Sequence, residues 1–161
     1  IIFVEYVKDI AKLAKKKGLK KILVTNGYLS KESFDYLNKE ELVDAMNVDL
    51  KSFKDEVYKK YCGATKGVRP VLDTIERANN AGIHLEITTL LIPDLNDSDK
   101  ELEKIAKFIY DLDKKGDIPL HISRFFPMYK FSNKKPTEIK TLKKAEEIGK
   151  RYLKNVHLGN I

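Results

Sequence analysis

The chain has 161 residues, a formal net charge of +7 and a single cysteine, Cys62. This length predicts about one domain, at roughly 100–200 residues per domain. With 42% apolar and 34% charged residues the chain has material for a core, which argues against disorder. One cysteine excludes an internal disulfide, and also a zinc site or iron–sulfur cluster built from several cysteines of this chain. No apolar run approaches the roughly 20 residues of a membrane span, so we expect no membrane association.

Helical and extended segments alternate along the chain. In the first half of the chain, the spacing of apolar residues predicts a helix over 2–17, a strand over 22–24, a helix over 30–37 with a second helical piece over 39–43, and a strand over 45–50. A charged helical stretch ending at 59–60 follows, and then a helix over 69–81 and a strand over 83–92. The last elements are a helix over 98–112, a strand over 118–125, a helix carrying 139–153 and a strand over 156–158. Gly18 and Gly82 are candidate C-terminal caps, and Ser30 is a candidate N-cap. Ser98 and Glu101 fit an S-x-x-E capping box.

This alternation predicts an α/β fold with parallel strands joined by helical crossovers. The sequence has no GxGxxG after a strand and no P-loop, so neither a dinucleotide site nor a Walker-type phosphate site is indicated. The remaining parallel architectures are a flavodoxin-like sheet and a β/α barrel. Without an internal repeat or a linker, residues 1–161 are one domain or one piece of a domain.

The positive charge is almost all lysine, since arginine occurs only four times, at Arg69, Arg77, Arg124 and Arg151. Lysines alternate with acidic residues on helical segments, which is typical of a solvated helix face. Specific nucleic-acid readers rely on arginine, so this composition argues against a nucleic-acid partner. The dense lysines of 15–21 suit a helix C-terminus. Composition resembles that of thermophiles, and the lone cysteine with no signal pattern predicts the cytoplasm.

Polar side chains gather at the carboxyl ends of the predicted strands. They are the Thr25-Asn26-Gly27 turn, Asp49 and Lys51, Thr88 and Thr89 with the 93–97 segment, and His121, Ser123 and Arg124. Because the chemistry of β/α barrels occurs at this end of the strands, these residues mark a candidate site.

Asp49 and Lys51 are two residues apart on an extended segment, so they are expected to share a face. Buried charges are unfavourable unless they are paired or used, which favours a functional role over a plain ion pair. Lys51 could bind a carboxylate as a point charge. For Glu86 and His121, structural and functional roles remain equally open.

The other candidates have simpler interpretations. By itself the 25–27 turn is a common way to end a strand. His84 and His157 have no evident partner, and the three histidines of the chain lack the spacing of a metal triad. We interpret Cys62 as a packed or partly exposed thiol and not as a nucleophile.

Five segments in a fixed order carry a family resemblance. They are 24–28 (VTNGY), 45–51 (AMNVDLK), 61–64 (YCGA), 89–93 (TLLIP) with Asn96-Asp97, and 121–127 (HISRFFP). With these segments the chain resembles the middle and C-terminal part of a radical S-adenosylmethionine (SAM) domain. It is similar to the pyruvate formate-lyase-activating-enzyme-like branch, and within it to the radical SAM enzymes of the AmmeMemoRadiSam system.

The resemblance implies part of a (β/α)6 barrel, a partial TIM-type barrel, that binds SAM across the upper strand ends. It implies that Thr25 and Asn26 lie beside the methionine or ribose and that Asp49 and Lys51 contact the amino-acid and ribose portions. It also implies that Leu91 and Ile92 border the adenine, and that His121 and Arg124 lie on the last strands of the site. The family reduces SAM with a [4Fe-4S] cluster, and the resulting 5′-deoxyadenosyl radical abstracts hydrogen from a protein or small-molecule substrate. The expected electron donor is ferredoxin or flavodoxin.

The chain departs from the family pattern because it has neither the C-x3-C-x2-C loop nor the Gly-Gly-Glu segment. Cys62 cannot replace three thiolate ligands. The resemblance therefore implies no catalytic and no metal-ligating residue here. We expect an inactive, incomplete domain, a fragment whose cluster-binding part lies upstream.

Two alternatives stay open. The first is a basic, non-catalytic β/α module that binds RNA or a protein partner. Aromatic residues around Lys130 would support it, namely Phe125, Phe126, Tyr129 and Phe131. The second is an ordinary β/α enzyme that uses Asp49, Lys51 and Glu86 without SAM.

Overall fold

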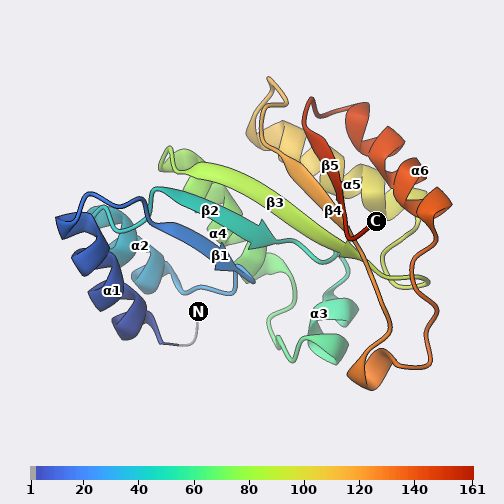
Figure 1. Ribbon diagram of the computed structural model, residues 1–161, viewed down its shortest axis with the longest axis horizontal. Coiled ribbons are helices and arrows are strands. Elements are labelled where there is room, and N and C mark those ends of the chain that lie inside the picture. The colour runs from blue at the N-terminus through green and yellow to red at the C-terminus, as the bar shows by residue number, and fades with distance from the viewer. Residues whose placement is uncertain (1–2) are drawn as a thin grey trace. The chain divides into compact units, whose positions relative to one another are not determined.

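The computed structural model describes residues 3–161 as helices alternating with strands (Figure 1). The helices are α1 (Val4–Lys16), α2 (Lys31–Lys39), α3 (Asp55–Tyr61), α4 (Arg69–Asn80), α5 (Asp99–Leu112), the 3-10 helix η1 (Tyr129–Phe131) and α6 (Ile139–Lys150). The strands are β1 (Ile22–Thr25), β2 (Ala45–Asp49), β3 (His84–Leu91), β4 (Leu120–Arg124) and β5 (Val156–Gly159). They form a five-stranded sheet in the order β1-β2-β3-β4-β5. The predicted α/β class with parallel strands is confirmed.

Most predicted elements occur where the pattern placed them, with one exception near the N-terminus. The predicted helix start at Ile2 lies outside the described residues, and α1 is described from Val4. The helical piece predicted over 39–43 is wrong. Glu41 has a φ of +53°, and the N–H of Leu42 bonds to the carbonyl of Leu37 at 2.9 Å, so the chain turns there.

The chain divides into two compact units, of which unit 1 comprises residues up to 49 and 69–85. In it β1 and β2 are parallel, with Ile22 opposite Ala45 and Thr25 opposite Val48. A small core joins α1, α2 and the turn after α2, through Ala11, Leu37 and Leu42. The Ser30 cap is confirmed, because its hydroxyl oxygen accepts from the N–H of Ser33 at 3.1 Å.

Unit 2 comprises residues 50–68 and 86–161. Strands β3, β4 and β5 are parallel, and Thr88, His121 and His157 stand opposite one another. Alternate residues of β3, among them Ile87 and Leu91, are fully buried. Helix α6 packs on β4, β5 and α5. This arrangement covers one face of the strands and leaves the side chains of the other face partly exposed.

The predicted capping box at the start of α5 is wrong. Ser98 occupies the N-cap but makes no side-chain cap hydrogen bond. Glu101 is buried and turns elsewhere: its carboxylate accepts from the hydroxyl of Ser52 and, at 2.6 Å, from the N–H of Phe53. A pattern of four residues cannot reveal that Glu101 accepts hydrogen bonds from donors 48 and 49 residues away in the sequence.

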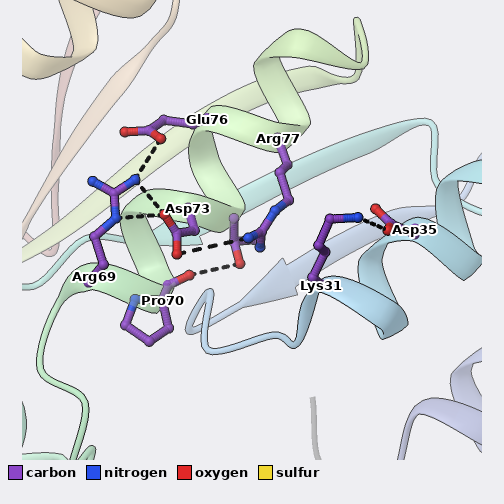
Figure 2. A network of polar contacts seen from close by, with 8 residues as sticks. Lys31, Asp35, Arg69, Pro70, Asp73, Glu76 and Arg77 are labelled. Atoms are coloured by element: carbon purple, nitrogen blue, oxygen red, sulfur yellow. Dashed lines mark hydrogen bonds and ion pairs between the residues drawn. The ribbon is translucent and has the colours of Figure 1, made fainter.

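An ion-pair network holds the exposed side of α4 (Figure 2). Arg69 donates from Nε to Asp73 at 2.6 Å and from its terminal nitrogen to Glu76 at 2.8 Å. These hydrogen bonds, with that to Asp73 the strongest, raise the pKa of Arg69 above its ordinary value. Figure 2 also shows the Lys31–Asp35 pair, one turn apart on α2. Such surface pairs contribute little to stability, so we interpret the network as local support for these helices.

Stability of unit 1 should depend on the ionisation of Asp44, just before β2. Its carboxylate accepts from Lys21 Nζ at 2.8 Å and from the N–H of Lys21 at 2.7 Å. Both hydrogen bonds, the side-chain one first, lower the pKa of Asp44. A lowered folded-state pKa means that this stabilisation is present above the unfolded pKa of roughly 3.9 and is lost as pH falls through the folded value. We expect D44N to flatten the acid limb of urea-unfolding free energy against pH. The control D9N, at an exposed position of α1, should retain the acid limb of the wild-type curve. Identical curves for D44N and wild type would contradict this role of Asp44.

Candidate functional site

Three predicted site residues lie at the carboxyl edge of unit 1. Thr25 ends β1 and Asp49 ends β2, and the register places Thr25 opposite Val48, next to Asp49. Asn26 follows Thr25 and is exposed. Parallel strands that stop together bring these polar groups to one edge.

The turn that follows β1 uses part of the hydrogen-bonding capacity of these side chains. The hydroxyl oxygen of Thr25 accepts from the N–H of Gly27 at 3.2 Å, and Oδ1 of Asn26 accepts from the N–H of Tyr28 at 3.0 Å. Gly27 has a φ of +70°, and a Cβ there would lie 2.7 Å from Val48 Cγ1 and 2.9 Å from Val71 Cγ1. The bond to Tyr28 uses Oδ1 of Asn26, and the amide nitrogen is a separate donor group, so turn and ligand roles are compatible.

In unit 2, the segment after β2 is fixed by buried polar side chains. Asn96 donates from Nδ2 to the carbonyls of Lys51 at 2.7 Å and Leu90 at 2.9 Å, and its Oδ1 accepts from the N–H of Ile92 at 2.8 Å. Thr89 Oγ1 donates to the carbonyl of Leu50 at 2.7 Å. One buried amide thereby links the strand end of β3 to the backbone that carries Lys51.

Glu101 fixes the next part of the same segment, through Ser52 and Phe53 as described above. The N–H of Lys51 donates to the phenolic oxygen of Tyr58 at 3.0 Å. Hydrogen bonds hold the backbone at Lys51 and on both sides of it, so the Cα from which its side chain extends has a fixed position. β2 itself ends at Asp49, so Lys51 lies beyond the strand and not on it.

A cavity of about 200 Å³ opens beside Lys51. Its walls are mostly apolar and come from the segment after β2, from α3, from the end of β3 and from η1: Lys51, Val57, Tyr61, Cys62, Leu90, Ile92, Leu95, Asn96 and Phe131. The rings of Tyr61 and Phe131 lie 5.3 Å apart between centroids. Pockets that enclose a whole drug-sized ligand have roughly 300–1,000 Å³, so this cavity suits one flat or apolar portion of a ligand.

The two residues predicted beside adenine lie on opposite faces of the strand end. Ile92 lines the cavity. Leu91 is fully buried, among the alternate residues of β3 that form the core. Leu90 takes its place on the cavity wall, because neighbouring residues of a strand point to opposite faces.

The partly exposed face of β3–β5 carries a row of ionisable side chains. Nε2 of His121 lies 2.9 Å from Oε2 of Glu86, and both side chains are 33% exposed. The ring of His157 stacks on that of His121 at 5.2 Å with 27° between the planes. The prediction that His157 has no partner is therefore wrong, because the pairing of β4 with β5 brings the two rings together.

Arg124 is committed largely to the loop that follows β4. Its Nε donates to the carbonyl of Thr137 at 2.8 Å, and its guanidinium lies 4.8 Å from the ring centroid of Phe126. Thr137 is fully buried, and its hydroxyl donates to the carbonyl of Leu91 at 2.5 Å. These contacts tie the loop to the strand ends.

The eight predicted site residues fall in two groups. Unit 1 contains Thr25, Asn26 and Asp49, and unit 2 contains Lys51, Leu91, Ile92, His121 and Arg124. Sequence reasoning missed Asn96 and Glu101 as anchors and Leu90, Tyr61 and Phe131 as cavity walls. Only the period-two pattern of β3 could have indicated Leu90.

Within residues 3–161 no three His, Cys, Asp or Glu side chains are grouped so that they could hold a metal ion. The lone thiol, Cys62, is exposed. No helix in the described part of the chain has the length and apolarity needed to cross a membrane.

Comparison with known proteins gives a consistent result. The sequence matches the Radical SAM superfamily over residues 2–109. A protein of Methanocaldococcus jannaschii named as a glycyl-radical enzyme activating enzyme is 36% identical over 158 residues, covering 92% of this chain and 55% of that protein. The pyruvate formate-lyase-activating enzyme of Clostridium pasteurianum is 32% identical over 123 residues, covering 73% of this chain and 48% of the relative. The chain therefore spans about half the length of these relatives.

A solved structure shares the fold. The crystal structure of a domain of a pyruvate-formate lyase-activating enzyme from Bacteroides vulgatus superposes with a TM-score of 0.80 at 21% identity. The match covers 99% of this chain and 92% of that chain.

Proposed function

Because the chain belongs to the radical SAM superfamily, we propose that it is the SAM-binding part of an activating enzyme whose substrate is a glycyl-radical enzyme. The observation that carries this proposal is the cavity beside Lys51, at the strand ends where the family resemblance places SAM. The names of the two curated relatives support the substrate class. We further propose a cytoplasmic enzyme with reduced ferredoxin or flavodoxin as electron donor.

The walls of the cavity suit the adenine of SAM. Leu90 and Ile92 offer apolar surface, and the Tyr61–Phe131 pair offers ring edges and faces to a flat base. The ammonium of Lys51 supplies a positive charge for a carboxylate or a ribose oxygen. From the family resemblance we assign Thr25, Asn26 and Asp49 to the methionine and ribose portions, and His121 and Arg124 to the end of the site.

A [4Fe-4S] cluster does not fit the residues of this chain, because Cys62 is its single cysteine and cluster binding needs several thiolates. In the family the cluster supplies the electron that cleaves SAM. The role left to this chain is to bind and orient SAM and to exclude water from the adenine of SAM.

We also propose that residues 1–161 are one incomplete domain. Support comes from an apolar face of unit 1: Ile22 and Val24 of β1 are 63% and 80% exposed. Beside them, a groove of about 310 Å³ runs between α1 and β1. Exposed apolar patches of this kind mark interfaces. We assign this one to a preceding β/α unit of the same polypeptide, since the curated relatives are about twice as long.

The single cysteine provides a direct test of SAM binding. Cys62 is exposed and lines the cavity, so a bound base should shield its thiol. We expect SAM, S-adenosylhomocysteine and 5′-methylthioadenosine to slow alkylation of Cys62 by iodoacetamide, about tenfold at ten times Kd. Mass spectrometry of the intact chain follows the reaction.

Two controls make this experiment decisive. Methionine alone lacks the base and should not protect the thiol. K51M should weaken protection by SAM more than protection by 5′-methylthioadenosine, which has no carboxylate. An alkylation rate that no adenosine-bearing ligand changes would overturn the assignment of the cavity.

A second candidate function rests on exposed aromatic residues after β4. Tyr129 is 85% exposed, and Lys130 Nζ lies 5.5 Å from its ring centroid. Such a surface would serve a basic module that binds RNA or a protein. A nucleic-acid affinity that falls steeply with salt would favour it over SAM binding.

A further inference from the structure

The partly exposed face of unit 2 carries a carboxylate–imidazole pair, of which the proposed function uses His121 and gives Glu86 no role. Glu86 and His121 stand on neighbouring parallel strands, β3 and β4, and Thr88, two residues after Glu86, is opposite His121. Their polar atoms meet across that offset at 2.9 Å. Both residues alternate with buried neighbours, Leu85 and Ile87 on β3 and Leu120 and Ile122 on β4, so rigid strands hold them.

The contact determines which ring nitrogen of His121 carries the proton. An ionised carboxylate only accepts, so Nε2 of a neutral His121 is the protonated donor toward Glu86. Nδ1 is then the nitrogen with a lone pair. Among the described residues of unit 2, no hydrogen-bond donor engages Nδ1. The strand pair therefore presents an acceptor of fixed orientation on its partly exposed face.

His157 limits the movement of this ring from the other side. It lies on β5 directly opposite His121, and the two rings are nearly parallel, 27° apart, at a centroid distance of 5.2 Å. His121 is thus held by a hydrogen bond at one edge and by an aromatic ring on one face. A base oriented by a carboxylate is the arrangement used where proton position matters.

We propose that Glu86 is a positioning residue for His121: it keeps the proton on Nε2 so that Nδ1 accepts a hydrogen bond from a hydroxyl or amino group of the bound ligand, while His157 supports the ring. This inference rests on the proposed function, which makes that ligand SAM. It adds Glu86 and His157 to the residues that serve the site.

Nitrogen-15 NMR of the labelled chain tests the proposal without any turnover. Long-range proton–nitrogen spectra distinguish a protonated ring nitrogen from one with a lone pair. In the wild-type chain we expect the Nε2–H form of His121, and in E86Q we expect a substantial share of the Nδ1–H form. The matched control is E147Q, on the exposed side of α6 in the same unit, and it should leave His121 unchanged.

Titration with SAM supplies the second measurement. We expect E86Q to weaken SAM binding about tenfold, as for the loss of one well-oriented hydrogen bond, and E147Q to bind as wild type does. H157F keeps a stacking ring and should keep the Nε2–H form.

The outcomes separate this inference from the proposed function. A wild-type His121 in the Nδ1–H form, a tautomer that E86Q does not change, or equal SAM affinity of E86Q and wild type would overturn the positioning role. If the chain does not bind SAM at all, both the proposed function and the ligand half of this inference fail, and the tautomers of wild type and E86Q still decide whether Glu86 positions the ring.

Discussion

Replacing Asn96 by leucine is expected to destabilise the chain by about 3 kcal/mol or more, at roughly 1–3 kcal/mol for each buried group left without a partner. Asn96 is 1% exposed and makes three hydrogen bonds, to the carbonyls of Lys51 and Leu90 and from the N–H of Ile92. Leucine has a similar volume and fills the space, but it cannot replace the hydrogen bonds that Asn96 makes to these two carbonyls and to this N–H. Urea unfolding measures the loss.

The N96L variant should lose ligand binding as well as stability. Lys51 and Ile92 both border the cavity, and Asn96 is the side chain that fixes their backbones. We expect N96L to lose protection of Cys62 by SAM even where it stays folded. The control N133L, on an exposed loop of the same unit, should change the free energy of unfolding by no more than about 0.5 kcal/mol. Equal stabilities of N96L and N133L would contradict the anchoring role.

Replacing Gly27 by alanine is expected to destabilise the chain by a similar amount, about 2–5 kcal/mol, for two separable reasons. A φ of +70° disfavours any residue with a Cβ by roughly 1–2 kcal/mol. The new methyl also meets Cγ1 of Val48 at 2.7 Å and of Val71 at 2.9 Å, and overpacking adds roughly 1–3 kcal/mol. Both valines are fully buried, so neither can move aside easily.

Gly18 provides a matched control for the backbone contribution. Its φ is +68°, but a Cβ there would meet nothing within 4 Å. G18A should therefore show only the strain, and the difference between G27A and G18A in urea unfolding measures the crowding. V48A should partly rescue G27A, so that the double variant is more stable than the sum of the single effects predicts. Equal losses for G27A and G18A would show that the turn has room.

Two features of the site could be predicted from sequence because each depends on local spacing. The alternation within β3 separates buried Ile87 and Leu91 from the partly exposed residues between them, as a period of two requires. Polar residues that follow successive strands indicated the carboxyl edge, and Thr25, Asn26 and Asp49 do lie there in unit 1. The family resemblance added the ligand class, which periodicity cannot supply.

The capping prediction failed because the contact that decides it joins distant residues. Ser98 and Glu101 satisfy a capping pattern, yet Glu101 bonds to Ser52 and Phe53, about 50 residues earlier. For Leu91 the recognised segment left the side-chain direction open: Leu91 is buried, whereas Leu90 and Ile92 line the cavity, and its assignment to adenine stays a prediction. A motif names a segment, and the direction of each side chain depends on how the strand is placed.

By itself the sequence determined the order of helices and strands, which faces are apolar, and that one cysteine cannot hold a cluster. These properties depend on spacing of 2 and 3.6 residues and on composition. Only the tertiary structure decided that Glu86, His121 and His157 form one row and that Asn96 anchors Lys51. The physical reason is that these contacts join residues 35 to 45 positions apart, and strand register and loop path, not local pattern, set which distant side chains meet.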